Sequence, residues 1–369
     1  MEGLVQELQE LSLKSNGGSP IYPLVNNLGF PETPISAVSD TNISIPRNAV
    51  LDSSSYRTPG SDFYQNNQYA YHVDEGYNPR SFMTCPKPTP ESFENYLERC
   101  SIQEKAQIVN FLIKDQYTLV DMAKDPHSIN FVKKVIESVK GSPTLRDGIK
   151  SALALAGINE TFELMIHPIG YQLVSHCFNH LTDEDNLTLF ETATHFCLQL
   201  ATSEKGCASL KTCIYKSNTE YRRLIVDQII ANSLMLAKHY YGNFIIQVII
   251  DLHNPMYNER ICLRLKENLE DLVLSKSGSY VVEKCLKSSA SEAILEGFIS
   301  LDAKKLENIA RHPFGNYALQ TALVVSKNSR FHDQLVNAVE QLSDELSCDR
   351  HAKNVLSLVR SSRRRNRRY

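Results

Sequence analysis

The stretch HYYGNFIIQVIID at residues 239–251 decides the fold, because versions of it recur along the chain. Each version opens with a short polar turn and continues into an apolar run of helical period. The others are DPHSINFVKKVIE at 125–137, HPIGYQLVSHCFN at 167–179, EKGCASLKTCIYK at 204–216, SKSGSYVVEKCLK at 275–287, HPFGNYALQTALV at 312–324 and a weaker DRHAKNVLSLVRS at 349–361. A phrase that returns this often indicates a solenoid, in which each unit buries its faces on its neighbours.

The phrases are regularly spaced. Their fourth residues are 128, 170, 207, 242, 278, 315 and 352, so the successive intervals are 42, 37, 35, 36, 37 and 37 residues. An amphipathic run precedes the phrases, for example at residues 221–238, and no alternating strand pattern lies between them. We therefore predict an all-α, curved helical solenoid with two helices in each unit.

The first 90 residues differ in character from the rest. They hold ten of the fifteen prolines, among Asn, Ser and Gly, and helical periodicity begins only at Glu91. Such a segment cannot bury enough apolar surface to offset its ordering entropy, so we predict that residues 1–90 are disordered. Residues 91–116 are typical of a worn repeat or an N-terminal cap, and residues 362–369 of a basic tail.

Composition and motifs narrow the function classes. No apolar run approaches the roughly 18 residues of a membrane-spanning helix, so we expect no membrane association. Nine cysteines without a CxxC pair favour a reducing compartment over disulfides or zinc. Protease, hydrolase, P-loop and dinucleotide motifs are all missing, so we expect neither catalysis nor a cofactor. The formal net charge of −3 neither supports nor excludes nucleic-acid binding.

Three consecutive phrases carry a polar pair four residues apart and an aromatic ring beside it. The residues are Asn243, Phe244 and Gln247, then Ser279, Tyr280 and Glu283, then Asn316, Tyr317 and Gln320. Four-residue spacing places both polar side chains on one helix face. Amides can donate to and accept from a base edge, a carboxylate can accept two N–H groups, and a ring can stack on a base. The pattern favours single-stranded RNA as the ligand.

The phrases HYYGNFIIQ, SKSGSYVVE and HPFGNYALQ resemble the Pumilio (PUF) family of RNA-binding repeat proteins, a resemblance that covers roughly residues 91–361. It implies a Pumilio homology domain at 91–361, with about six repeats at 117–330 between helical caps. In that family Asn and Gln with an aromatic residue read uracil, Ser and Glu read guanine, and the RNA runs antiparallel to the repeats. The phrases at 312, 275 and 239 would then read 5′-UGU-3′ in that order.

Base chemistry agrees with this assignment. Guanine presents N1–H and N2–H₂ side by side, which a carboxylate such as Glu283 can accept together. Uracil presents two acceptors and one N–H, which suit an amide such as Gln247 or Gln320. A carboxylate facing uracil would meet carbonyl oxygens and be repelled.

The three N-terminal phrases depart from the pattern. By phrase position they carry Ile129, Asn130 and Lys133, then Tyr171, Gln172 and Ser175, then Ala208, Ser209 and Thr212. We expect these side chains to read bases loosely or in a different manner. His167, His239 and His312 open three phrases at the repeat period, so we expect them to cap or pack there rather than to catalyse.

The resemblance implies a protein that binds UGU-containing mRNA 3′ untranslated regions and regulates translation or mRNA stability with protein co-regulators. We expect a cytoplasmic monomer that shuttles through the nucleus if two segments act as signals. Leu4, Leu8, Leu11 and Leu13 resemble an export signal, and Arg360–Arg368 an import signal or a phosphate contact. Two alternatives remain open: a HEAT- or armadillo-type scaffold that binds a protein, and a divergent PUF-like nucleolar protein that acts on pre-rRNA.

Overall fold

The computed structural model describes residues 97–217 and 219–366. The chain divides into two units, residues 1–71 and 72–369, and every described residue belongs to the second. The predictions made for residues 1–90, including the leucine pattern at 4–13, therefore lie outside the described residues.

The described residues form helices and turns and contain no β-strand, as the phrase pattern predicted. The helices are α3 (Ile102–Leu112), α4 (Thr118–Lys124), α5 (Ile129–Val139), α6 (Pro143–Ile166), α7 (Tyr171–His180), α8 (Leu187–His195), α9 (Cys197–Ala201), α10 (Glu204–Lys216), α11 (Thr219–Ala231), α12 (Ser233–Lys238), α13 (Gly242–Asp251), α14 (Pro255–Lys266), α15 (Leu269–Val273), α16 (Lys276–Leu286), α17 (Ser291–Ile299), α18 (Ala303–Arg311), α19 (Gly315–Val325), η3 (Ser326–Asn328), α20 (His332–Glu340), α21 (Ser343–Leu346) and α22 (Ala352–Asn366).

Each unit holds three helices rather than the predicted two. The amphipathic run at 221–238 breaks at Asn232, whose Nδ2 donates to the Gln228 carbonyl at 2.9 Å, and the short α12 then turns away from α11. In α6 the equivalent break is at Gly157, which has a φ of 76° that glycine adopts without a Cβ clash. A periodicity that continues across both breaks cannot reveal them.

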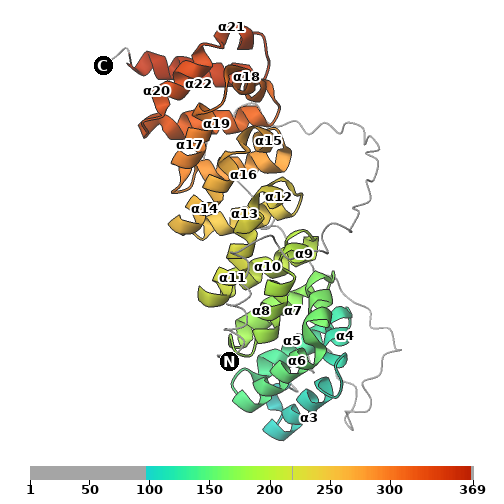
Figure 1. Ribbon diagram of the computed structural model, residues 1–369. Coiled ribbons are helices and arrows are strands. Elements are labelled where there is room, and N and C mark those ends of the chain that lie inside the picture. Colours follow the sequence, from blue (N-terminus) through green and yellow to red (C-terminus); the bar gives the residue numbers. More distant parts are fainter. Residues whose placement is uncertain (1–96, 218, 367–369) are drawn as a thin grey trace, which may run out of the picture. The chain divides into compact units, whose positions relative to one another are not determined.

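Seven such units follow one another through the stack, as Figure 1 shows from α3 to α22. They are α3–α5, α6–α7, α8–α10, α11–α13, α14–α16, α17–α19 and α20–α22. The helical text at 91–116 therefore contributes α3 to the first unit, and the weak phrase at 349–361 contributes the last helix of a complete seventh unit.

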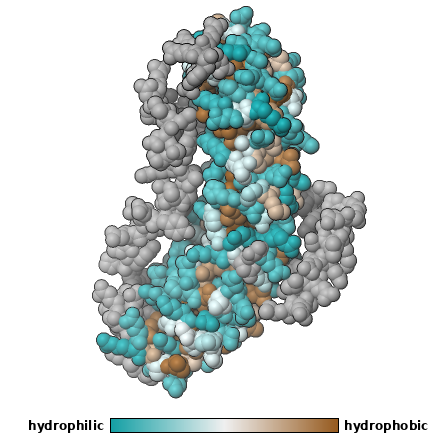
Figure 2. All heavy atoms as spheres, turned by 90° about the vertical axis from the view of Figure 1, so that its left-hand side faces the viewer, coloured by the Kyte–Doolittle hydropathy of each residue, from teal (hydrophilic) through white to brown (hydrophobic). Residues whose placement is uncertain are grey.

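The core lies between the helices of successive units. In α13 five aliphatic residues are buried: Ile245, Ile246, Val248, Ile249 and Ile250. Helix α13 packs on α16, and α16 packs on α19, so the phrase helices are neighbours. On the side that lies to the left in Figure 1, hydrophilic residues predominate and hydrophobic ones form separate patches (Figure 2).

Helix α22 crosses the C-terminal boundary predicted at residue 361 and continues to Asn366. Arg363, which lies in the predicted basic tail, pairs with Glu340 of α20, with 2.6 Å between Nη2 and Oε2. Its Nη2 also donates to Asn337 on the same helix. None of the described helices is long and apolar enough to cross a membrane.

Candidate nucleic-acid interface

The start of each phrase helix is set by one repeated hydrogen bond. In every unit a side chain ahead of the helix accepts from the backbone N–H three residues later, at 2.7–3.3 Å. The pairs are Asp125 with Ser128, His167 with Gly170, Ser203 with Gly206, His239 with Gly242, Ser275 with Gly278, His312 with Gly315 and Asp349 with Ala352. The capping role predicted for the three histidines is confirmed, and the intervals between caps become 42, 36, 36, 36, 37 and 37 residues.

These caps shift the register of the third unit by one residue. Gly206 occupies the position of Gly278, since a Cβ at either would lie within 2.8 Å of a backbone carbonyl oxygen of the preceding short helix. The residues equivalent to the triplet that begins at Ser279 are therefore Cys207, Ala208 and Lys211.

The predicted reading roles of Ser209 and Thr212 are wrong for the same reason. Ser209 is buried and its Oγ donates to the Met165 carbonyl at 2.7 Å, while Thr212 Oγ1 donates to the Ala208 carbonyl at 3.1 Å. Sequence reasoning missed Cys207 and Lys211. The Ser-x-x-Gly motif that residues 203–206 share with residues 275–278 gives the correct alignment and would have identified both positions.

The amide pairs of α13 and α19 have the same geometry. Asn243 is 3% exposed, and its Nδ2 donates to the carbonyls of His239 and Tyr240 at 2.9 and 2.7 Å. Its Oδ1 accepts from Gln247 Nε2 at 3.1 Å. Asn316 and Gln320 repeat this arrangement, with 2.8 Å between Oδ1 and Nε2.

The two amides of each pair therefore have different roles. Asparagine satisfies the turn carbonyls and holds the glutamine, so it is a positioning residue. Glutamine, half-buried at the surface, keeps its Oε1 and one N–H for a ligand, since no other described residue takes them in a hydrogen bond.

Helix α16 presents a carboxylate at the position of those glutamines. Ser279 is buried and its Oγ donates to the Lys276 carbonyl at 2.9 Å. Burial raises the pKa of Glu283, against smaller opposing effects from Lys287 and the Thr321 hydroxyl. Thr321 of α19 donates through its hydroxyl to Glu283 Oε2 of α16, at a long 3.4 Å. A partly desolvated carboxylate with one weak donor has room to accept a ligand that carries N–H groups.

Aromatic rings lie beside these polar groups. Tyr280 and Tyr317 are 52% and 50% exposed, unusually high for large aromatic residues on a packed helix, and Phe244 is half-buried. Two exposed rings and one half-buried ring, at three successive levels, provide stacking surfaces that a base of any identity can use.

The reading positions of the N-terminal units contact one another instead. Lys133 Nζ donates to Gln172 Oε1 at 2.7 Å, which joins α5 to α7. The ammonium of Lys205 lies 5.2 Å from the centre of the Tyr171 ring, which joins α7 to α10. Asn130 is exposed and Ser175 half-buried. These contacts occupy Lys133, Gln172 and the Tyr171 ring, which a base would otherwise meet.

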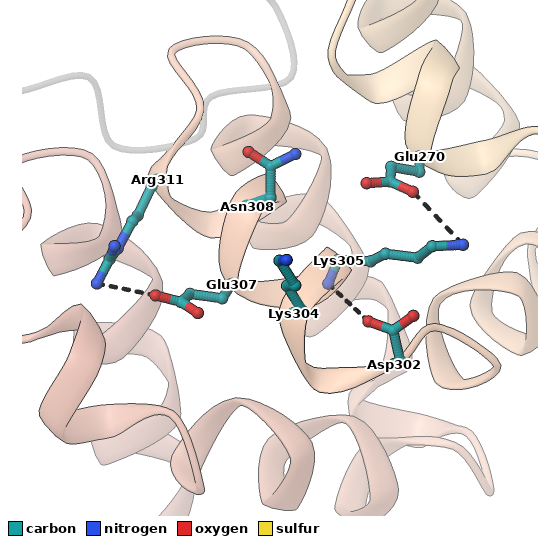
Figure 3. A pocket seen from close by; sticks show the side chains of 7 residues that line it. All are labelled: Glu270, Asp302, Lys304, Lys305, Glu307, Asn308 and Arg311. Carbon is teal, nitrogen blue, oxygen red and sulfur yellow. Dashed lines mark hydrogen bonds and ion pairs between the residues drawn. The ribbon is translucent and has the colours of Figure 1, made fainter.

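Two surface hollows lie elsewhere. One of about 480 Å³ is lined by α18, by Asp302 at its start and by Glu270, and it contains two ion pairs (Figure 3). Lys305 lies 3.6 Å from Glu270, and Arg311 lies 2.9 Å from Glu307. The other, of about 510 Å³, contains the Arg146–Asp185 pair. No cluster of metal-ligating side chains occurs among residues 97–217 and 219–366.

A family model described as the Pumilio-family RNA-binding repeat matches the chain in six segments. They are residues 119–142, 161–191, 196–230, 232–255, 268–294 and 306–339. The chain belongs to the Pumilio (PUF) family. The matched segments are RNA-binding repeats and not a catalytic domain. Each segment contains one of the first six phrases, and the sixth segment extends into α20 of the seventh unit.

Two curated relatives of similar sequence come from Arabidopsis thaliana. Pumilio homolog 12 is 29% identical over 281 residues, which cover 74% of this chain and 46% of the relative. Pumilio homolog 11 is 30% identical over 245 residues, which cover 64% and 42%. The chain thus spans about half the length of the curated relatives that it matches.

Solved PUF structures share the fold. The Puf4 RNA-binding domain bound to the HO endonuclease RNA 3′ UTR recognition sequence has a TM-score of 0.65 and 23% identity, and covers 73% of this chain and 83% of its own. The RNA-binding domain of yeast Puf5p bound to SMX2 RNA has a TM-score of 0.64 and 17% identity, with coverages of 74% and 83%. The all-α PUF solenoid predicted from the sequence is confirmed.

Proposed function

We propose that this protein binds single-stranded RNA through the phrase helices and selects a 5′-UGU-3′ core in mRNA 3′ untranslated regions. Bound there, it would regulate translation or mRNA stability by recruiting protein co-regulators. The observation that carries the proposal is the alternation along three neighbouring helices. A held glutamine on α13 and another on α19 flank a partly desolvated carboxylate on α16.

The hydrogen-bonding groups left on these side chains match the three bases. Gln247 and Gln320 each keep an N–H for a uracil carbonyl and an Oε1 for uracil N3–H. Glu283 has two acceptor oxygens for guanine N1–H and N2–H₂. These donors would replace the hydrogen bonds to water that the carboxylate loses through its burial. Tyr280 and Tyr317 supply stacking that does not depend on base identity.

The order UGU follows from the antiparallel RNA direction of the family, with α19 reading the first base. The Puf4 and Puf5p structures that share this fold have RNA bound, and the Puf4 ligand is a 3′ UTR recognition sequence. A protein-binding scaffold would have no need of this alternating set of polar groups beside exposed rings.

Competition binding of the full chain to short single-stranded RNAs tests the proposal. The RNAs carry UGU or UUU in otherwise identical sequences, at one stated salt concentration. The wild type should prefer UGU by about 1–3 kcal/mol, the usual discrimination of a bidentate contact to a base. A double variant, Ser279→Asn with Glu283→Gln, gives α16 the amide pair of its neighbours and should prefer UUU.

The double variant Asn316→Ser with Gln320→Glu provides the matched reciprocal control. It gives α19 the α16 pair, so the preferred core should become GGU while the other two levels stay unchanged. Binding that is equal for all cores would exclude sequence-specific recognition by these residues. If no RNA binds, the face serves another partner and the scaffold alternative gains support.

A further inference from the structure

Helix α10 lies next to the three reading helices and carries a different set of groups. It packs against α13, and Cys207 Sγ donates to the Tyr241 carbonyl in the turn that precedes α13, at 3.7 Å. In the RNA direction of the proposed function, the base that follows the second U of UGU lies at the level of α10. The inference below therefore rests on that function.

Two of the three α10 reading positions offer little to a base. Burial raises the pKa of Cys207 to about 12, so its thiol stays neutral and its hydrogen is committed to Tyr241. Ala208 has no ring, in contrast to Phe244 at the equivalent position of α13. Lys211 is thus the polar group that α10 presents at this level.

Lys211 stands where α13 and α19 have glutamine. It is half-buried, and its ammonium lies 6.0 Å from the centre of the Tyr215 ring one turn further along α10. No carboxylate among the described residues forms an ion pair with it. The charge therefore remains to be satisfied by water or by a ligand.

The chemistry of an ammonium group distinguishes bases by their acceptors. It has three N–H donors and no acceptor. On the Watson–Crick edge, uracil presents O2 and O4 and cytosine presents N3 and O2, whereas adenine presents only N1 and guanine only O6. Guanine also presents three N–H bonds, which repel a cation. We propose that Lys211 selects a pyrimidine as the base immediately 3′ of UGU.

Competition binding of the full chain to UGUU, UGUC, UGUA and UGUG RNAs tests this. The two pyrimidine RNAs should bind roughly five- to tenfold more tightly than the two purine RNAs, because one charged contact discriminates at the lower end of the usual range. Lys211→Met, which removes the ammonium without introducing the amide that reads uracil on α13 and α19, should abolish this difference and leave the preference for UGU over UCU intact. Lys216→Met, at the exposed end of the same helix, is the charge-matched control and should retain the pyrimidine preference.

Two results would overturn the proposal while leaving the UGU function intact. One is equal affinity of the wild type for all four RNAs. The other is a Lys211→Met variant that binds all four more weakly by the same factor and with a shallower salt dependence, which would assign the ammonium to a phosphate. A wild type that does not distinguish UGU from UCU would instead refute the proposed function, and the register on which Lys211 is placed would fall with it.

Discussion

The three histidine caps make the stability of the solenoid depend on pH. In each of His167, His239 and His312, Nδ1 accepts two backbone N–H groups, two and three residues ahead, at 3.1–3.3 Å. Nδ1 must be unprotonated to accept, so each ring is neutral with its proton on Nε2. Burial is the main cause that lowers the pKa of all three below the ordinary 6.5.

The sign of the effect follows from proton linkage. Because the folded-state pKa is lowered, the unfolded chain binds more protons between the two pKa values, and stability rises with pH through that window. The contribution is complete above the unfolded pKa of 6.5 and is lost as the pH falls towards the lower folded values. Losing a helix N-cap costs about 1 kcal/mol, and caps in separate units add nearly independently, so acidification should remove about 3 kcal/mol.

Urea unfolding of the full chain at several pH values between about 7.5 and 5 would measure this change. The chain supplies its own control, because Ser203 and Ser275 cap two other units with hydroxyls that do not titrate in this range. A triple variant with serine at 167, 239 and 312 should keep its stability near neutral pH and lose most of the acid sensitivity.

Other half-buried histidines, such as His176 and His332, are common to both proteins and cancel in the comparison. If the triple serine variant loses stability with falling pH as steeply as the parent, the caps are not the titrating groups and the reasoning fails.

Two further changes probe the interface and its support. Tyr317→Ala should weaken RNA binding by about 1–3 kcal/mol without changing the preferred base, and a changed preference in competition binding would show that the ring reads rather than stacks. Gly278→Ala would place a methyl group 2.4 Å from the Leu272 carbonyl oxygen and push α16 from α15. Its unfolding midpoint should fall by an amount equivalent to about 1–3 kcal/mol, and an unchanged midpoint would contradict the close approach.

Repeat periodicity predicts the fold of this chain well, because each phrase must both start a helix and bury its apolar face on the next unit. It could not predict the third helix of each unit. The run at 221–238 keeps its apolar period across Asn232, and the break comes from hydrogen bonding and packing that the period does not encode.

Aligning the phrases by residue similarity also placed the register of α10 one residue away from its position in the structure. Three units use histidine as the cap and two use serine. The two residue types accept the same backbone hydrogen bond, through Nδ1 or Oγ, but they do not resemble each other in a sequence alignment. Aligning Glu204 with His239 moved Ser209 from the core to the predicted interface. The three C-terminal triplets escaped this error because their Gly residues fix the alignment.

The different roles within each amide pair also lay beyond the sequence. Four-residue spacing places Asn243 and Gln247 on one face, and both were predicted to meet the base. The structure buries the asparagine against the turn carbonyls, which requires the tight turn made possible by Gly242. A pattern shows which side chains share a face, whereas the depth of each depends on the turn beneath it.

Stability and recognition are linked through the residue that starts each helix. His239 accepts through Nδ1 from Gly242 N–H and through its carbonyl from Asn243 Nδ2, and Asn243 in turn holds Gln247. His312 supports Gln320 through the same sequence of contacts. If the cap moved by one residue along the chain, a residue at the surface would move into the core, and its neighbour would take its place; Ala208 and Ser209 are such a pair. A different side chain would then face the RNA. The cap therefore determines which side chain can read a base as well as where the helix begins.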